Sequence, residues 1–102
     1  MKKIILLSFC ITLILSGCGA SDIEKAQARA VDIGESYLDY EITAQEAAEQ
    51  LDSILVPETE GNGQTYLEAD ITALSFAITR RDSTYEEVAE KVEYIKGRDY
   101  TD

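Results

Sequence analysis

The stretch from Thr65 to Gly97, TYLEADITALSFAITRRDSTYEEVAEKVEYIKG, carries the pattern that decides the fold. Its apolar residues recur at intervals of three and four, which is the spacing of one face of an α-helix. One such stripe consists of Leu67, Ile71, Leu74 and Ile78, widened by Ala73, Phe76 and Ala77. A second stripe consists of Tyr85, Val88, Val92 and Ile95. The stretch therefore predicts two consecutive amphipathic helices.

Capping boxes indicate where the helices begin. In such a box a Ser or Thr is followed three residues later by Glu, and each side chain bonds the backbone of the other residue. Thr65–Glu68 and Ser83–Glu86 open the two helices above, and Thr43–Glu46 opens an earlier one. Arg80 and Arg81 end the first of the pair, where positive charge suits the helix dipole. Gly97 is the expected C-cap of the second.

Two further helices precede this pair. The first begins at Ser21 or Asp22, and its stripe consists of Ile23, Ala26, Ala30, Ile33, Tyr37 and Tyr40. Gly34 lies inside it and indicates either a kink or a close contact with another helix. The helix that begins at Thr43 has an apolar face made of Ala47, Leu51, Ile54 and Leu55, and Pro57 ends it.

These elements predict an all-α fold. We expect a small bundle of three to four short amphipathic helices over residues 22–97, with mostly antiparallel neighbours. Residues 56–64, with Gly61-Asn62-Gly63 at their centre, form the one clear loop. Residues 18–21 are expected to be a tether, and residues 98–102 a flexible tail.

The amino terminus has the pattern of an export signal. Met1-Lys2-Lys3 is a short basic segment, and the twelve residues from Ile4 to Leu15 are apolar apart from Ser8 and Thr12. A transmembrane helix needs about 20 such residues, whereas the apolar region of a signal peptide has roughly 7–15. Residues 1–17 are therefore expected to be a cleaved signal peptide, which leaves 85 residues.

The end of this segment, Leu15-Ser16-Gly17-Cys18, resembles the lipobox of bacterial lipoprotein precursors at all four positions. The resemblance implies that the Cys18 thiol receives a diacylglycerol group and that a dedicated signal peptidase cuts the Gly17–Cys18 bond. It also implies a lipid-anchored protein on the extracytoplasmic side of the cell membrane or the outer membrane. Gly19 is not the Asp that marks inner-membrane retention in many such proteins. The resemblance covers residues 1–18 alone.

Charge restricts what the mature domain binds. The chain has 9 Lys and Arg against 20 Asp and Glu. Loss of Lys2 and Lys3 with the signal peptide leaves 7 basic residues, so the formal net charge falls from −11 to −13. Phosphate backbones bind through Lys and Arg, so nucleic acid is excluded as a partner. Anionic lipid headgroups also repel such a domain.

The composition excludes most catalytic chemistry. The chain has no His, Cys10 is lost with the signal peptide, and Cys18 is expected to be blocked by lipid. The Ser-His-Asp and Cys-His mechanisms therefore lack their parts, and a zinc site lacks its ligands. The chain has no glycine-rich phosphate loop. A carboxylate pair is present in any chain with 20 acids, but a small bundle leaves little room for a cleft. We expect no enzymatic activity and no cofactor.

One loop invites comparison with a calcium site. Glu58, Glu60 and Asn62 fall at the first, third and fifth positions of an EF-hand-like loop, and Gly63 at its turn position. The twelfth position, which holds a bidentate Glu in that motif, is Ala69, and Glu68 comes one residue early. The loop is therefore expected to be a connector, with millimolar calcium binding at most as the alternative.

The mature chain contains six tyrosines: Tyr37, Tyr40, Tyr66, Tyr85, Tyr94 and Tyr100. We expect Tyr37, Tyr40 and Tyr85 to cover the ends of the core. Tyr94 and Tyr100 fall off the inner stripe and are the candidate interface residues, since tyrosine is favoured in binding surfaces. The expected function is that of a non-catalytic interaction or accessory module, which binds a protein partner at the cell envelope. A small-ligand or calcium binder is the alternative.

Overall fold

The computed structural model describes residues 21–101 of the chain. Within these residues it contains four α-helices and no strand: α2 (Asp22–Leu38), α3 (Ala44–Asp52), α4 (Gly63–Thr79) and α5 (Tyr85–Gly97). The prediction of a small all-α bundle is confirmed. The predicted signal peptide and lipidation site, residues 1–18, lie outside the described residues.

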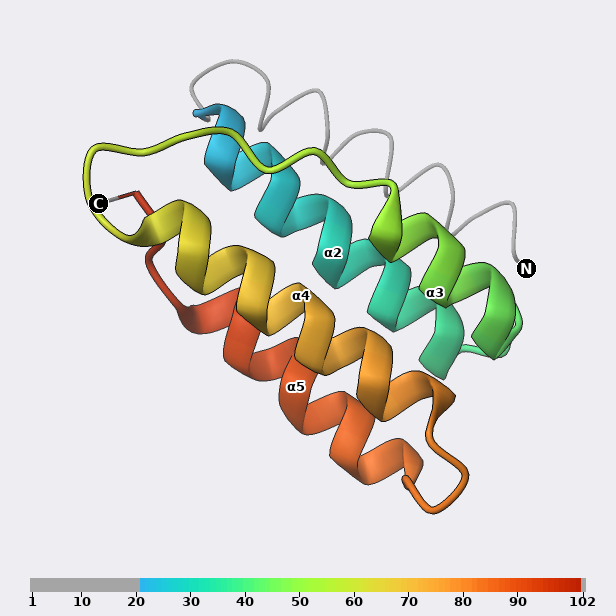
Figure 1. Ribbon diagram of the computed structural model, residues 1–102. Coiled ribbons are helices and arrows are strands. Elements are labelled where there is room, and N and C mark those ends of the chain that lie inside the picture. The colour runs from blue at the N-terminus through green and yellow to red at the C-terminus, as the bar shows by residue number, and fades with distance from the viewer. Residues whose placement is uncertain (1–20, 102) are drawn as a thin grey trace.

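The four helices surround one apolar core (Figure 1). α4 lies between α3 and α5, and α2 packs across all three of them. Short connections join the helices within each sequential pair, and a longer loop crosses from the end of α3 to the start of α4. The largest fully buried side chains are Ile33, Leu51, Leu67, Leu74, Val88, Val92, Ile95 and Tyr100. Most of these residues lie on the stripes that the sequence predicts.

Two of the helices begin with a reciprocal capping box. The Thr43 hydroxyl accepts the Glu46 amide at 3.1 Å, and the Glu46 carboxylate accepts the Thr43 amide at 2.9 Å, which confirms the predicted box at α3. Ser21 and Glu24 form a second box, at the start of α2. Each box satisfies two amides that a helix leaves without partners.

The predicted starts of the other two helices are wrong. α5 is capped by Thr84, one residue after Ser83, and the Thr84 hydroxyl accepts the Glu87 amide at 3.1 Å. α4 begins at Gly63, so Thr65 lies inside the helix, and its N-cap residue, Asn62, makes no side-chain bond. The preceding loop caps α4 instead, since the Thr59 hydroxyl accepts the Gln64 amide at 3.1 Å.

Two predicted helix ends are also wrong. α3 ends at Asp52, well before Pro57, because the Ser53 hydroxyl donates to the Gln50 carbonyl at 2.8 Å and the chain then leaves the helix. Leu55 consequently lies outside α3 and is 92% exposed. Gly97 is the last residue of α5 rather than a left-handed cap, and no glycine among the described residues has a positive φ.

Three further predicted members of the apolar stripes, Phe76, Tyr40 and Tyr85, lie outside the core, and Tyr85 is 41% exposed. Phe76 is 65% exposed, because it lies half a turn away from the buried stripe of α4. Tyr40 follows the end of α2 with a φ of 63° and is 74% exposed. The ring of Tyr85 lies 5.2 Å from the rings of both Tyr37 and Tyr40, so the three tyrosines form one cluster at the end of the bundle.

Gly34 permits a close contact between α2 and α5. It is buried on α2, and a Cβ at this position would lie 2.4 Å from Val92 Cγ2 on α5. Val92 is itself 1% exposed and belongs to the apolar core. The sequence left open a kink or a close helix contact at Gly34, and the structure shows the close contact.

Replacing Gly34 by alanine is expected to destabilise the domain. The added methyl overlaps Val92, and overpacking a core costs about 1–3 kcal/mol, whereas alanine brings roughly 1 kcal/mol to a helix interior. Gly97→Ala is the matched control, because nothing lies within 4 Å of its added Cβ. Thermal melting should therefore show a decrease for Gly34→Ala and no decrease for Gly97→Ala. Equal shifts would show that the α2–α5 contact tolerates a methyl group.

Candidate functional site

The candidate site is a shallow groove of about 540 Å³ between α4 and α5. Its lining residues are Asp70, Ala73, Glu87, Glu90, Lys91, Tyr94 and Ile95. α4 contributes the first two and α5 the rest, because both helices turn one flank toward this groove as they pack. The lining has three carboxylates and one ammonium group, so the groove is acidic.

Tyr94 forms an aromatic wall of this groove and is 55% exposed. Its hydroxyl accepts a hydrogen bond of 2.7 Å from Nη1 of Arg98, one turn further along the chain. This bond holds the ring in place, which reduces the entropy that the side chain would lose on binding. The structure thus leaves Tyr94 accessible, and its role as an interface residue stays a prediction.

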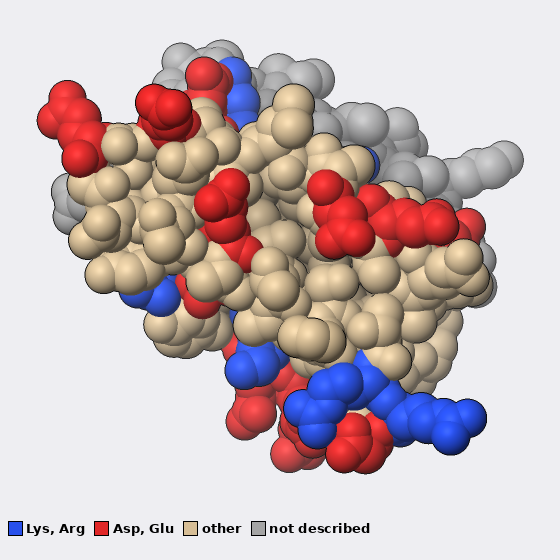
Figure 2. Space-filling model, in the orientation of Figure 1, with Lys and Arg blue, Asp and Glu red and all other residues tan. Residues whose placement is uncertain are grey.

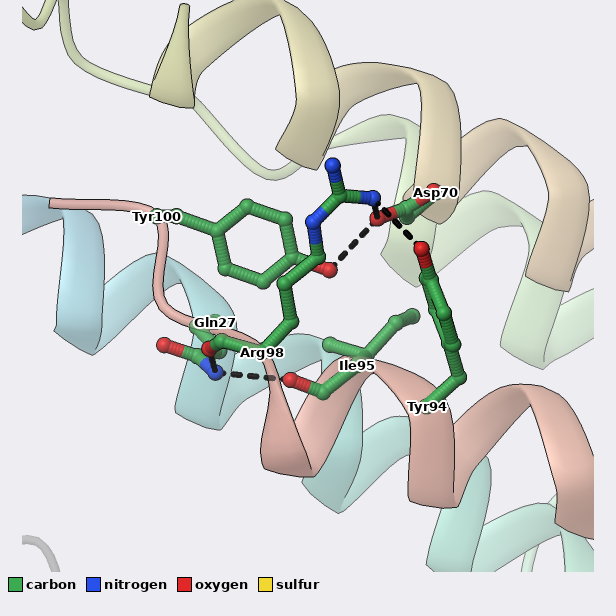
Figure 3. A network of polar contacts seen from close by, with 6 residues as sticks. All are labelled: Gln27, Asp70, Tyr94, Ile95, Arg98 and Tyr100. Atoms are coloured by element: carbon green, nitrogen blue, oxygen red, sulfur yellow. Dashed lines mark hydrogen bonds and ion pairs between the residues drawn. The ribbon is translucent and has the colours of Figure 1, made fainter. Parts of the chain in front are cut away.

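Arg98 connects Tyr94 to α4 (Figure 3). Its Nη1 also donates to Oδ2 of Asp70 at 3.1 Å, and both side chains are largely buried, at 29% and 18% exposed. The guanidinium carbon lies 4.6 Å from the centre of the Tyr66 ring, within the range of a cation–π contact. Because Arg98 neutralises Asp70, the two carboxylates of Glu87 and Glu90 against the one ammonium group of Lys91 leave the groove with a net charge of −1.

Tyr100 is the residue that sequence reasoning placed wrongly. It was a candidate interface residue in a flexible tail, but it is 1% exposed and belongs to the core. Its hydroxyl donates to Oδ2 of Asp70 at 2.6 Å, the same oxygen that Arg98 contacts (Figure 3). The prediction fails because the helical period ends at Gly97, and beyond that point no periodicity indicates which face of the chain is buried.

The tail is also fixed from the side of α2. The Gln27 side chain donates from Nε2 to the carbonyl oxygens of Ile95 and Arg98, at 2.7 Å in each case. These carbonyls lie at the end of α5, where a helix leaves its last acceptors without partners. Residues 98–101 are therefore docked on the bundle, and the prediction of a flexible tail is wrong for them.

Burial raises the pKa of Tyr100, and its hydrogen bond to the Asp70 carboxylate raises that pKa further. The phenol donates to an oxygen that carries negative charge, so loss of its proton would place two negative groups together. Tyr100 is consequently a hydrogen-bond donor that keeps its proton. The Asp70 carboxylate therefore lines the groove with its negative charge already paired.

The predicted calcium loop does not assemble a ligand set. Glu58 and Glu60 are exposed in the loop, Asn62 is the N-cap residue of α4, and Glu68 is exposed on the helix itself. Within residues 21–101, no three side chains of His, Cys, Asp or Glu come together as metal ligands. Glu58 and Glu60 line one pocket with Asp22, and calcium binding stays a prediction. The lipidation site, Cys18, lies outside the described residues.

Tyr100→Phe is expected to lower the free energy of unfolding by about 1.5–3 kcal/mol at neutral pH, since it removes a bond to a charged acceptor. The stabilisation from Tyr100 is complete below its unfolded pKa of about 10. It declines at higher pH, because the unfolded chain then releases a proton that the folded chain retains. Denaturant unfolding of the two proteins should thus differ most below about pH 10 and converge above it.

Tyr94→Phe is the control for this measurement, because it also removes one tyrosine hydroxyl, from an exposed ring. Its stability should change by less than about 0.5 kcal/mol. Equal losses in the two variants would contradict the assignment of Tyr100 as the buried donor.

No family model, no characterised protein and no solved structure matches the chain. Within the described residues, none of the helices combines the length and the apolar character that a membrane span requires.

Proposed function

We propose that this chain is a lipid-anchored extracytoplasmic lipoprotein, and that its helical domain is a non-catalytic module that binds a basic segment of a protein partner at the cell envelope. The observation that carries the proposal is the acidic groove between α4 and α5, with Tyr94 held at its wall. Its charge and shape suit a protruding Lys or Arg side chain.

The groove offers a cation two kinds of interaction. Glu87 and Glu90 lie one turn apart along the same rim and are both exposed, so an ammonium or guanidinium group can approach both. The accessible ring of Tyr94 supplies a cation–π surface beside them. The net charge of −13 expected for the mature chain adds long-range attraction for a basic partner.

The proposed anchor keeps the helical domain near the membrane. Cys18 precedes the N-cap residue Ser21 by three residues, a span of about 10 Å when fully extended. Two acyl chains give stable anchoring at about 0.8 kcal/mol per buried CH₂. At the same end of the bundle, Ser21 and Asp22 lie near Glu58 and Glu60. Repulsion between these carboxylates and anionic headgroups favours a domain that stands away from the lipid surface.

The groove is tested by removing its charges. A photo-crosslinker at position 73, which also lines the groove, should capture a specific neighbour in native membranes. We expect Glu87→Gln with Glu90→Gln to reduce that adduct about tenfold, which corresponds to roughly 1.4 kcal/mol. The matched control is Glu86→Gln with Glu93→Gln, which removes two exposed carboxylates of the same helix that do not line the groove. Equal effects of the two pairs would count against the groove.

The anchor is tested at Cys18. Metabolic labelling with palmitate should mark the wild-type chain and leave Cys18→Ser unlabelled, and the variant should move from the membrane fraction to the soluble fraction. Folding of the variant is checked by its melting temperature. Membrane association that survives Cys18→Ser unchanged would contradict the lipid anchor while leaving the groove to be judged separately.

A further inference from the structure

A guanidinium group of the chain itself occupies an aromatic pocket beside the groove. Three tyrosine rings lie near the guanidinium carbon of Arg98. Their centres are 4.6 Å away for Tyr66, 5.4 Å for Tyr94 and 5.5 Å for Tyr100. All three distances fall within the range of a cation–π contact. We refer to the three rings and the Asp70 carboxylate as the guanidinium pocket, since these groups together suit a planar cation.

The guanidinium pocket and the groove share two residues. Asp70 and Tyr94 line the groove, and both are hydrogen-bonded to Arg98 (Figure 3). A cation in the groove therefore lies next to a carboxylate that Arg98 already pairs. The groove has three carboxylates against one ammonium group, so its net charge is −2 when Asp70 is unpaired and −1 while Arg98 pairs it.

The ion pair of Arg98 with Asp70 lacks the best geometry of its groups. Such pairs are strongest when two parallel N–H···O bonds form, at about 2.7–2.9 Å. Here Nη1 alone contacts Oδ2, at 3.1 Å, and the same nitrogen also donates to the Tyr94 hydroxyl. The Tyr100 hydroxyl donates to Oδ2 as well, and within residues 21–101 no hydrogen bond reaches Oδ1. A guanidinium that approaches freely can use both carboxylate oxygens.

The main chain around Arg98 is fixed, while its side chain can move alone. The Arg98 carbonyl accepts a bond of 2.7 Å from Gln27, and Tyr100, two residues later, is 1% exposed. The Arg98 side chain is partly exposed, and among the described residues all of its hydrogen bonds are made by Nη1. It can therefore rotate into solvent without undocking the tail.

We propose that the guanidinium pocket receives an arginine of the protein partner, and that Arg98 occupies the pocket when the partner is absent. This inference rests on the proposed function, and it names arginine rather than lysine as the residue recognised. The planar fork of arginine matches a carboxylate and stacks on aromatic rings, whereas the lysine ammonium is a compact point charge. The incoming group replaces Arg98 in kind at Asp70.

Occupation by Arg98 also makes binding selective. A partner must displace an arginine that is always present, so its apparent affinity falls by the fraction of molecules in which the pocket is open. A lone cation gains little from such an exchange. A basic segment gains more, because its other cations meet Glu87 and Glu90 in the same groove, and Arg98 makes no hydrogen bond to either.

A small guanidinium compound tests the pocket without any partner. Ethylguanidinium at millimolar concentration is added to the detergent-solubilised full chain, and the melting temperature is measured. We expect a rise of at least about 2 °C for Arg98→Ala and none for the wild type, in which Arg98 fills the pocket. Ethylammonium, of equal charge, should give a smaller rise. Asp70→Asn in the Arg98→Ala background should abolish the rise. Arg98→Met, which keeps an apolar stem, replaces Arg98→Ala if the alanine variant does not melt cooperatively.

The adduct at position 73 tests displacement of Arg98 by the partner. Arg98→Ala should increase this adduct at least about threefold, because the partner no longer competes with an internal arginine. Lys96→Ala is the matched control and should leave the adduct unchanged. It removes the same charge from the same end of α5, and Lys96 is exposed and paired with Glu35 of α2. If Arg98 serves only to hold Tyr94, Arg98→Ala should decrease the adduct instead.

The outcomes keep this inference apart from the proposed function. If the wild type gives no adduct, the proposed function fails, and ethylguanidinium still decides whether the pocket accepts a guanidinium. The pocket is overturned by no rise for Arg98→Ala, by an equal rise with ethylammonium, or by a rise that survives Asp70→Asn. An adduct that Arg98→Ala does not increase, but that Glu87→Gln with Glu90→Gln reduces, overturns the displacement of Arg98 and leaves the proposed function standing.

Discussion

The packing of α2 against α5 is the contact on which the rest of the bundle depends. These are the first and last helices of the described chain, so their contact closes the arrangement of four around a single core. Gly34 allows the backbone of α2 to approach Val92 at a distance that no side chain would permit. Lys96 and Glu35 add an ion pair of 3.6 Å across the same two helices, but both are exposed, so its contribution is small.

Closure of the bundle determines where the carboxyl-terminal residues go. With α5 against α2, the last carbonyls of α5 lie within reach of Gln27, and the chain then turns toward α4. There Tyr100 and Arg98 both bond to Asp70, and Arg98 in turn positions Tyr94. One chain of contacts thus runs from the interior to the wall of the groove. The exposed aromatic ring that is available to a partner is held by residues that also stabilise the fold.

The surface combines two kinds of face with different physical character. The groove between α4 and α5 is acidic and contains an accessible tyrosine, which suits a cationic partner. The exposed face of α4 that lies opposite the core is largely uncharged (Figure 2), and the Thr72 and Thr79 hydroxyls on it donate to carbonyls of their own helix. The two surfaces lie on different flanks of α4.

The sequence by itself determined the helical class, most of the core and the capping box at Thr43, because all of these follow from periodicity and local hydrogen bonding. It left open whether Gly34 allows a kink or a close helix contact, and the position of Val92 on α5 decided for the contact. Tertiary structure decided the burial of Tyr100, the exposure of Phe76, and the groove that joins Asp70 of α4 to Tyr94 of α5. A helical repeat specifies which residues share a face within one helix. Which faces meet, and where a segment without a repeat docks, depends on contacts between residues far apart in the chain.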